Sequence, residues 1–105
     1  MFNWKQKYES ISMSDFAAKV SPQMTVIDVR TPMEFQMGHI PGSKNHPLDQ
    51  IQSYQGNKEK IHYVICQSGM RSAQASRYLA DKGYDVVNVK GGMSRWLGKI
   101  TRGGI

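Results

Sequence analysis

One stretch near the middle of the chain constrains its fold more than any other. The apolar run 61–65 stops at Cys66, the only cysteine, and a helical pattern begins just after Arg71. A strand that delivers a cysteine into a short loop before a helix places the thiol beside helical N–H groups that lack internal partners. Such a loop binds anions and favours the thiolate over the thiol. We therefore expect Cys66 to be a nucleophile that acts on a small sulfur- or oxygen-bearing anion.

Strand-like and helix-like patterns alternate along the rest of the chain. Compact apolar runs predict strands at 9–11, 24–29, 43–46, 61–65 and 86–89. Amphipathic patterns and capping residues predict helices near 12–20, 32–37, 47–56, 72–82 and 93–97. This alternation is typical of an α/β domain with a largely parallel sheet and right-handed crossovers. Ligands bind outside the carboxyl ends of the strands in such sheets, and Cys66 follows one of these ends.

Two of the predicted helices begin with recognisable capping residues. Ser12 is followed three positions later by Asp15, and Thr31 is followed by Pro32 and then by Glu34. A hydroxyl at the N-cap and an acidic side chain three positions on satisfy N–H groups that the helix leaves free. We therefore interpret Glu34 as a capping residue and not as a catalytic one.

Length and composition exclude several classes of function. A chain of 105 residues with 39% hydrophobic and 21% charged residues suits one ordinary globular domain. The net charge of +6 comes from scattered residues, so we expect no nucleic-acid partner, and no apolar run is long enough for a membrane. A single cysteine suits a reducing, cytoplasmic compartment. The three histidines lack the spacing of metal ligands, so we expect no metal and no cofactor.

The single domain is expected to have its core over about 11–97. Residues 1–8 are interpreted as an N-terminal arm that packs through Phe2 and Trp4. Residues 98–105, which contain several glycines, are interpreted as a loose C-terminal tail. The short helix before this tail carries Met93 and Trp96, which we expect to close the core.

The charges around Cys66 favour an anion site. No carboxylate occurs between Glu59 and Asp81, so the local field is positive. Because no acid lies near Arg71 in sequence, we favour an anion-clamping role for its guanidinium over a surface ion pair. Gly69 provides the backbone freedom for the loop to curl, so that its N–H groups converge on one point.

Other polar residues weigh less in the expected site. Asp28 and Arg30 follow a predicted strand and are candidates for lining the site, although an ion pair that fixes the strand end is the favoured interpretation. His39 is interpreted as a hydrogen-bonded turn residue. His62 alternates with apolar neighbours and is interpreted as an ordinary strand histidine.

Cys66 and Arg71, with four residues between them, resemble the active-site loop of the rhodanese (sulfurtransferase) family. Three further segments are similar to conserved blocks of that family: 28–35, 38–45 and 91–96. The similarity covers about 11–97 and is specific because the blocks occur together. It implies a single rhodanese domain with a five-stranded, mainly parallel sheet flanked by helices.

The resemblance implies a sulfurtransferase in which Cys66 is the catalytic residue. Its thiolate takes a sulfane sulfur from thiosulfate or another donor, holds it as a persulfide, and passes it to a thiol, cyanide or protein acceptor. The residues implied to bind the substrate anion and the persulfide are Gln67, Ser68, Gly69, Met70, Arg71 and Ser72.

Three alternatives remain open from the sequence. The first is a persulfide carrier or docking module in a protein-to-protein sulfur relay, with low turnover of thiosulfate. The second is a cysteine-dependent phosphatase or arsenate reductase, and the third is a catalytically silent scaffold. Tyrosine and dual-specificity phosphatases place five residues between cysteine and arginine, so the four residues here favour sulfur over phosphate. The presence of both Cys66 and Arg71 disfavours the scaffold.

Overall fold

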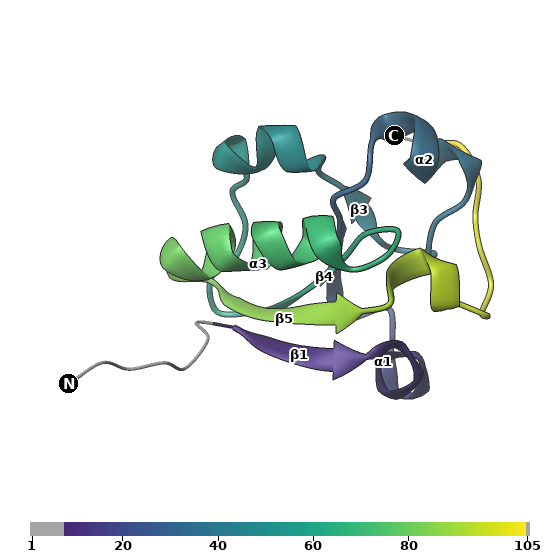
Figure 1. Cartoon of the computed structure of the whole chain (residues 1–105), viewed down its shortest axis with the longest axis horizontal. Coiled ribbons are helices and arrows are strands. Elements are labelled where there is room, and N and C mark those ends of the chain that lie inside the picture. The colour runs from purple at the N-terminus through teal and green to yellow at the C-terminus, as the bar shows by residue number, and fades with distance from the viewer. Residues whose placement is uncertain (1–7, 105) are drawn as a thin grey trace.

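The computed structural model describes residues 8–104, which form a five-stranded, all-parallel sheet with helices on both sides (Figure 1). The strands are β1 (Glu9–Ser12), β2 (Thr25–Asp28), β3 (Lys44–Asn45), β4 (Ile61–Ile65) and β5 (Asp85–Lys90). Their order across the sheet is β1-β5-β4-β2-β3. The predicted α/β class and parallel sheet are confirmed. Because β4 is the central strand, the residue after it lies in the middle of the carboxyl edge of the sheet.

Helices occur at all five predicted places. They are α1 (Met13–Lys19), α2 (Pro32–Met37), η1 (Leu48–Ser53), α3 (Met70–Asp81) and η2 (Gly92–Arg95). The segments η1 and η2 are short 3-10 helices, which corrects the α-helices expected there. The apolar residues Leu48, Ile51 and Tyr54 recur every three residues, and three is the period of a 3-10 helix. No helix within residues 8–104 has the length and apolar content needed to cross a bilayer.

Both predicted helix caps are confirmed. The Asp15 amide donates a 3.1 Å hydrogen bond to Oγ of Ser12 at the start of α1. At the start of α2, the Glu34 amide donates to Oγ1 of Thr31 at 3.2 Å, and the Thr31 amide donates to Oε1 of Glu34 at 2.9 Å. This reciprocal capping box fixes both the helix start and the position of the Glu34 carboxylate.

Apolar side chains form two cores, one on each face of the sheet. Side chains alternate between the two faces along a strand, and β4 shows this directly. Ile65 contributes to the core that contains Phe16 of α1. Val64 and Cys66 contribute to the core that contains Leu79 of α3. Met93 and Trp96 pack against the first of these cores, as predicted.

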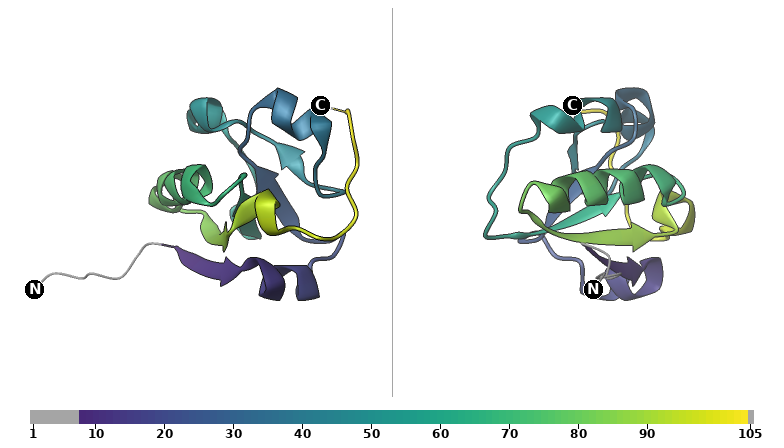
Figure 2. Two further views of the ribbon diagram at one scale, coloured as in Figure 1. Left: turned by 45° about the vertical axis from the view of Figure 1, so that its right-hand side comes forward. Right: turned by 60° about the vertical axis from the view of Figure 1, so that its left-hand side comes forward.

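Residues 98–104 of the predicted C-terminal tail lie beside α2 and form backbone hydrogen bonds that the interpretation as a loose tail did not include (Figure 2). The amide of His39 donates to the carbonyl of Thr101 at 2.9 Å, and the Thr101 amide donates back to the His39 carbonyl at 2.9 Å. The Gly103 amide donates to the carbonyl of Gln36 at 2.7 Å. The last carbonyls of a helix have no internal donors, and the tail supplies one here. The predicted packing of the arm through Phe2 and Trp4 lies outside the described residues.

Candidate active site

Cys66 is the residue that follows β4, and its sulfur lies inside the loop that leads to α3. The amide of Gly69 donates a 3.0 Å hydrogen bond to Sγ of Cys66. The thiol in turn donates to Oγ of Ser72 at 3.4 Å, and this hydroxyl donates to the Gly69 carbonyl at 3.1 Å. The loop therefore surrounds the sulfur with polar groups, which an inert buried cysteine does not require.

The polar environment changes the acidity of Cys66. Burial raises the pKa of the thiol, but hydrogen bonds from Ser72, Gly69 and Ser68 hold the pKa below its ordinary value. Each of these donors stabilises the thiolate more than the thiol. The Ser72 hydroxyl can turn from the Gly69 carbonyl to the sulfur once the thiol has lost its proton. The arrangement is that of an activated thiol rather than of an inert one.

The backbone conformation of Gly69 shapes this loop. Its φ of 109° lies in the left-handed region, and α3 begins at Met70 directly after it. The helix therefore starts two residues before the predicted Ser72. The predicted role of Gly69 as the flexible point of the loop agrees with this conformation.

The loop brings the predicted anion-binding residues together, but their exposure differs. Gln67, Ser68 and Met70 are exposed, whereas Ser72 is buried. Cys66 itself is 0% exposed. Any reactant must therefore reach Sγ between the residues of the loop.

A segment far along the chain supports the loop from behind. The amides of Met93 and Ser94 in η2 donate to the carbonyls of Cys66 and Gln67, at 2.8 and 3.0 Å. Gly92 adopts a φ of +58°, and a Cβ atom there would lie 2.3 Å from the Cys66 carbonyl oxygen. In sequence, Gly91 and Gly92 form an adjacent pair within the block 91–96. The pair of adjacent glycines was a signal of close backbone approach.

The buried pair Asp28–Arg30 joins the strand end to the loop. The guanidinium of Arg30 donates three hydrogen bonds to the Asp28 carboxylate, at 2.8 to 3.1 Å. The favoured ion pair is therefore present. The Arg30 guanidinium also donates to Oε1 of Gln67 at 3.3 Å and to the Gly38 carbonyl at 2.8 Å. Arg30 therefore holds the side chain of Gln67 in addition to fixing the end of β2.

Arg71 has an acidic partner that lies far from it in sequence. Its guanidinium forms a bidentate ion pair with Glu34, with N···O distances of 2.7 and 3.0 Å. The hydrogen bonds from Arg71 are the main reason that the pKa of Glu34 falls to about 2. The ion pair that was disfavoured is thus present, because its acid comes from a residue 37 positions away in sequence. The capping residue Glu34 is also a neighbour of the loop.

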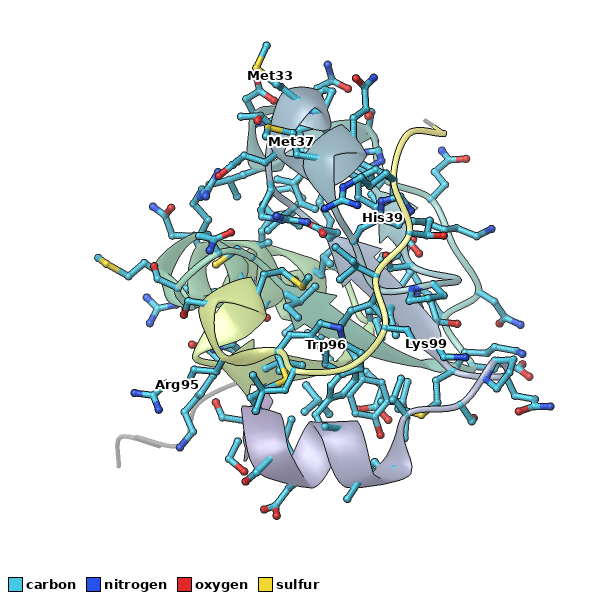
Figure 3. All side chains as sticks on the ribbon, turned by 90° about the vertical axis from the view of Figure 1, so that its right-hand side faces the viewer. Met33, Met37, His39, Arg95, Trp96 and Lys99 are labelled. Atoms are coloured by element: carbon cyan, nitrogen blue, oxygen red, sulfur yellow. The ribbon has the colours of Figure 1, made fainter. Side chains whose placement is uncertain are left out.

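A shallow groove of about 270 Å³ lies beside the loop and the ion pair. Its lining residues come from α2, the loop, η2 and the tail: Arg30, Glu34, Met37, Gly38, Gln67, Met93, Trp96 and Ile100. Figure 3 shows Met37 on α2 and Trp96 below it, near the ordered tail. His39 is buried behind this region, where its ring stacks on Phe35 with centroids 3.6 Å apart. His39 is thus a packed, hydrogen-bonded residue, as predicted.

The chain is similar to known proteins over nearly its whole length. Residues 12–99 match the family described as the rhodanese-like domain. The crystal structure of a rhodanese-like domain protein from Staphylococcus aureus superposes with a TM-score of 0.79 at 35% identity, covering 91% of this chain and 99% of that one. The predicted rhodanese-like fold is thereby confirmed.

Two relatives have names that refer to sulfur chemistry. The thiosulfate sulfurtransferase GlpE of Pseudoalteromonas translucida is 34% identical over 76 residues, 70% of this chain and 72% of that protein. The putative sulfur carrier protein YrkF of Bacillus subtilis is 36% identical over 94 residues, 85% of this chain. The chain spans about half, 51%, of the length of YrkF. By its matched residues and its fold, the chain belongs to the rhodanese-like domain family.

Proposed function

We propose that the protein is a sulfurtransferase that carries the transferred sulfur as a persulfide on Cys66. One observation carries this proposal: Sγ of Cys66 lies at the carboxyl edge of the sheet with the Gly69 amide 3.0 Å away and the Ser72 hydroxyl 3.4 Å away. Donors at these positions stabilise a thiolate and, after transfer, an anionic persulfide. The family and the sulfurtransferase among the relatives support the same chemistry.

The reaction has two transfers that share one covalent intermediate. With thiosulfate as donor, the Cys66 thiolate attacks the outer sulfur, the S–S bond of thiosulfate breaks, and sulfite leaves with the bonding electron pair. An acceptor thiolate or cyanide then attacks the outer sulfur of the Cys66 persulfide and releases the Cys66 thiolate. No general base is required, because the pKa of the thiol is already lowered by hydrogen bonds from the loop.

The length of the loop favours sulfur over phosphate. Four residues separate Cys66 from Arg71, which gives a small loop. The guanidinium of Arg71 is engaged by Glu34 and does not stand free for a tetrahedral phosphate. Both features favour transfer of a single sulfur atom.

A persulfide carrier is the second candidate. Cys66 is 0% exposed, and burial protects a stored persulfide from reaction with solvent. The putative sulfur carrier among the relatives supports this function. A carrier and an enzyme share the same covalent intermediate. They differ in how readily small-molecule donors and acceptors reach Cys66 and leave the site.

Intact mass spectrometry after incubation with thiosulfate tests the proposal. We expect the wild-type protein to gain one sulfur atom and the Cys66→Ser protein to gain none. No gain by the wild type from thiosulfate or from an organic persulfide would contradict both the enzyme and the carrier. Thiocyanate production with cyanide as acceptor then separates them, because only the enzyme turns over. Comparable hydrolysis of an aryl phosphate would instead favour a phosphatase.

A further inference from the structure

Both arginines beside the loop are already neutralised by carboxylates. Arg30 is paired with Asp28 in the buried site at the end of β2. Arg71 is paired with Glu34 through two hydrogen bonds. The formal charges of these four side chains cancel. The Glu34 carboxylate therefore offsets the charge of Arg71, the basic residue of the stretch 59–81 that lies in the loop region.

The position of the Glu34 carboxylate is fixed by hydrogen bonds from Thr31 as well as by Arg71. Its Oε1 atom accepts hydrogen bonds from the amide and from the hydroxyl of Thr31, at 2.9 and 3.1 Å. The same oxygen contacts Arg71 at 2.7 Å. The helix cap of α2 thus fixes the carboxylate where it faces the start of α3. The carboxylate is ionised at neutral pH, and the Arg71 hydrogen bonds lower its pKa further, to about 2.

This arrangement has a direct consequence for the charge of a sulfur donor. Thiosulfate brings two negative charges to the loop, where the Cys66 thiolate repels it. Because the Glu34 carboxylate offsets the charge of Arg71, the guanidinium offers this dianion little net attraction. An organic persulfide brings one negative charge and experiences less of this repulsion.

The groove beside the loop offers apolar contacts for an organic donor. Met37 is 70% exposed and lines the groove together with Trp96 and Ile100. Methionine and aromatic side chains adapt to carbon chains and to sulfur atoms of varied shape. The apolar side chains that line the groove can contact the carbon portion of a donor but offer little to thiosulfate.

We propose that Glu34 is a specificity-determining residue, which by neutralising Arg71 makes the site select small organic persulfides over thiosulfate. This inference rests on the proposed sulfurtransferase function. In the selected reaction, the Cys66 thiolate attacks the outer sulfur of R–S–S⁻, and the S–S bond breaks. R–S⁻ leaves with the bonding electrons and takes a proton from water, while Cys66 becomes the persulfide Cys–S–S⁻. Atoms and charge balance without an oxidant or a reductant.

The substitution Glu34→Gln tests the role of the charge. Glutamine retains a side-chain oxygen for the Thr31 amide and so preserves the capping box, but it removes the negative charge. Glu59→Gln is the matched control. It removes the same charge from an exposed residue that lines neither the groove nor the Cys66 loop. Rates of persulfide formation on Cys66 are measured with thiosulfate and with the persulfide of a short, uncharged alkyl thiol.

We expect the wild type and Glu59→Gln to prefer the alkyl persulfide. In Glu34→Gln, the ratio of alkyl persulfide rate to thiosulfate rate should fall at least tenfold, mainly because thiosulfate reacts faster. An unchanged ratio in Glu34→Gln, or a wild type that prefers thiosulfate, would overturn the inference while leaving the sulfurtransferase function intact. Failure of the wild type to gain sulfur from either donor would instead overturn the function itself.

A second pair of variants tests the apolar side of the groove. Met37→Gln removes an apolar contact that lines the groove, whereas Met33→Gln changes an equally exposed residue of the same helix that does not line it (Figure 3). We expect Met37→Gln to slow reaction with the alkyl persulfide several-fold and to leave the thiosulfate rate unchanged. Met33→Gln should change neither rate. Equal effects of the two substitutions would contradict a role for the groove in donor binding.

Discussion

The hydroxyl of Ser72 lies 3.4 Å from the sulfur of Cys66, and in the thiol form it accepts the S–H hydrogen bond while donating to the Gly69 carbonyl. This hydroxyl is the only side chain in the described chain that hydrogen-bonds the sulfur. Ser72 is buried in the first turn of α3, so its position relative to the loop is fixed by helix packing. The acidity of Cys66 thus depends on a residue of the helix as well as on loop amides.

Replacing Ser72 with alanine should raise the pKa of Cys66. The change removes a donor that stabilises the thiolate, while burial continues to oppose ionisation. The pH dependence of alkylation by a small haloacetamide reports this pKa directly, and the profile should shift to higher pH. Ser76→Ala is the control, since Ser76 is a buried serine on the same helix whose Oγ has no hydrogen-bond partner within the described residues. Identical profiles for the two variants would contradict the role of Ser72.

Replacing Gly92 with alanine should lower the free energy of unfolding by more than the backbone strain of a positive φ alone. The added Cβ would lie 2.3 Å from the Cys66 carbonyl oxygen, so η2 and the loop must separate. Gly42→Ala is the matched control, because Gly42 also has a positive φ of +86° but nothing within 4 Å of the added atom. In urea unfolding, we expect a loss of about 1 kcal/mol for Gly42→Ala and about 3 kcal/mol or more for Gly92→Ala. Similar losses would show that the contact with Cys66 is unimportant.

The ion pair between Glu34 and Arg71 should stabilise the fold in a pH-dependent way. The pKa of Glu34 falls from 4.5 to about 2, chiefly through the Arg71 hydrogen bonds, so its folded value is below its unfolded value. The stabilisation is therefore fully present above about pH 4.5 and is lost as the pH falls towards 2. Since about a third of each side chain is exposed, the contribution should be about 1 kcal/mol or less.

The difference in unfolding free energy between wild type and Glu34→Gln isolates this contribution from other acids. We expect the wild type to be more stable at pH 7 and the two proteins to converge as the pH falls through about 2. A difference that stays constant over this range would mean that the charge of Glu34 does not stabilise the fold.

Replacing Thr101 with proline should weaken the tail. Proline removes the N–H that donates to the His39 carbonyl at 2.9 Å, whereas Thr101→Ala retains this backbone donor. We expect a loss of about 1 kcal/mol for the proline variant, which lowers the melting temperature by about 4 °C or more. The alanine variant should melt close to wild type. Hydrogen exchange of the His39 amide should accelerate only in the proline variant, and equal protection in both would contradict the pairing.

Much of the fold was predictable because its signals are local. The capping box of Thr31 and Glu34 spans four residues, and the run 61–65 that forms β4 is continuous. The order of strands and helices follows from such signals taken one after another. The 3-10 character of η1 was visible in principle, since its apolar residues recur every three positions, but this spacing also fits one face of an α-helix.

Within the candidate site, only the residues of the loop 66–72 were predictable from the sequence. Cys66, Gly69 and Ser72 lie within seven residues, and their chemistry follows from a strand end followed by a helix start. The ion pair of Arg71 was not predicted, because only carboxylates close in sequence were considered. Glu34 reaches Arg71 from α2.

By itself, the sequence determined the α/β class, the helix caps and the cysteine between a strand end and a helix start, because each depends on residues that are neighbours along the chain. The tertiary structure decided which carboxylate pairs with Arg71 and which backbone segment packs against the loop. The order β1-β5-β4-β2-β3 brings the Glu34 carboxylate to Arg71 and Gly92 beneath the Cys66 carbonyl. Contacts of this kind depend on which strands pair across the sheet, and strand pairing is set by packing of the whole core rather than by any local pattern.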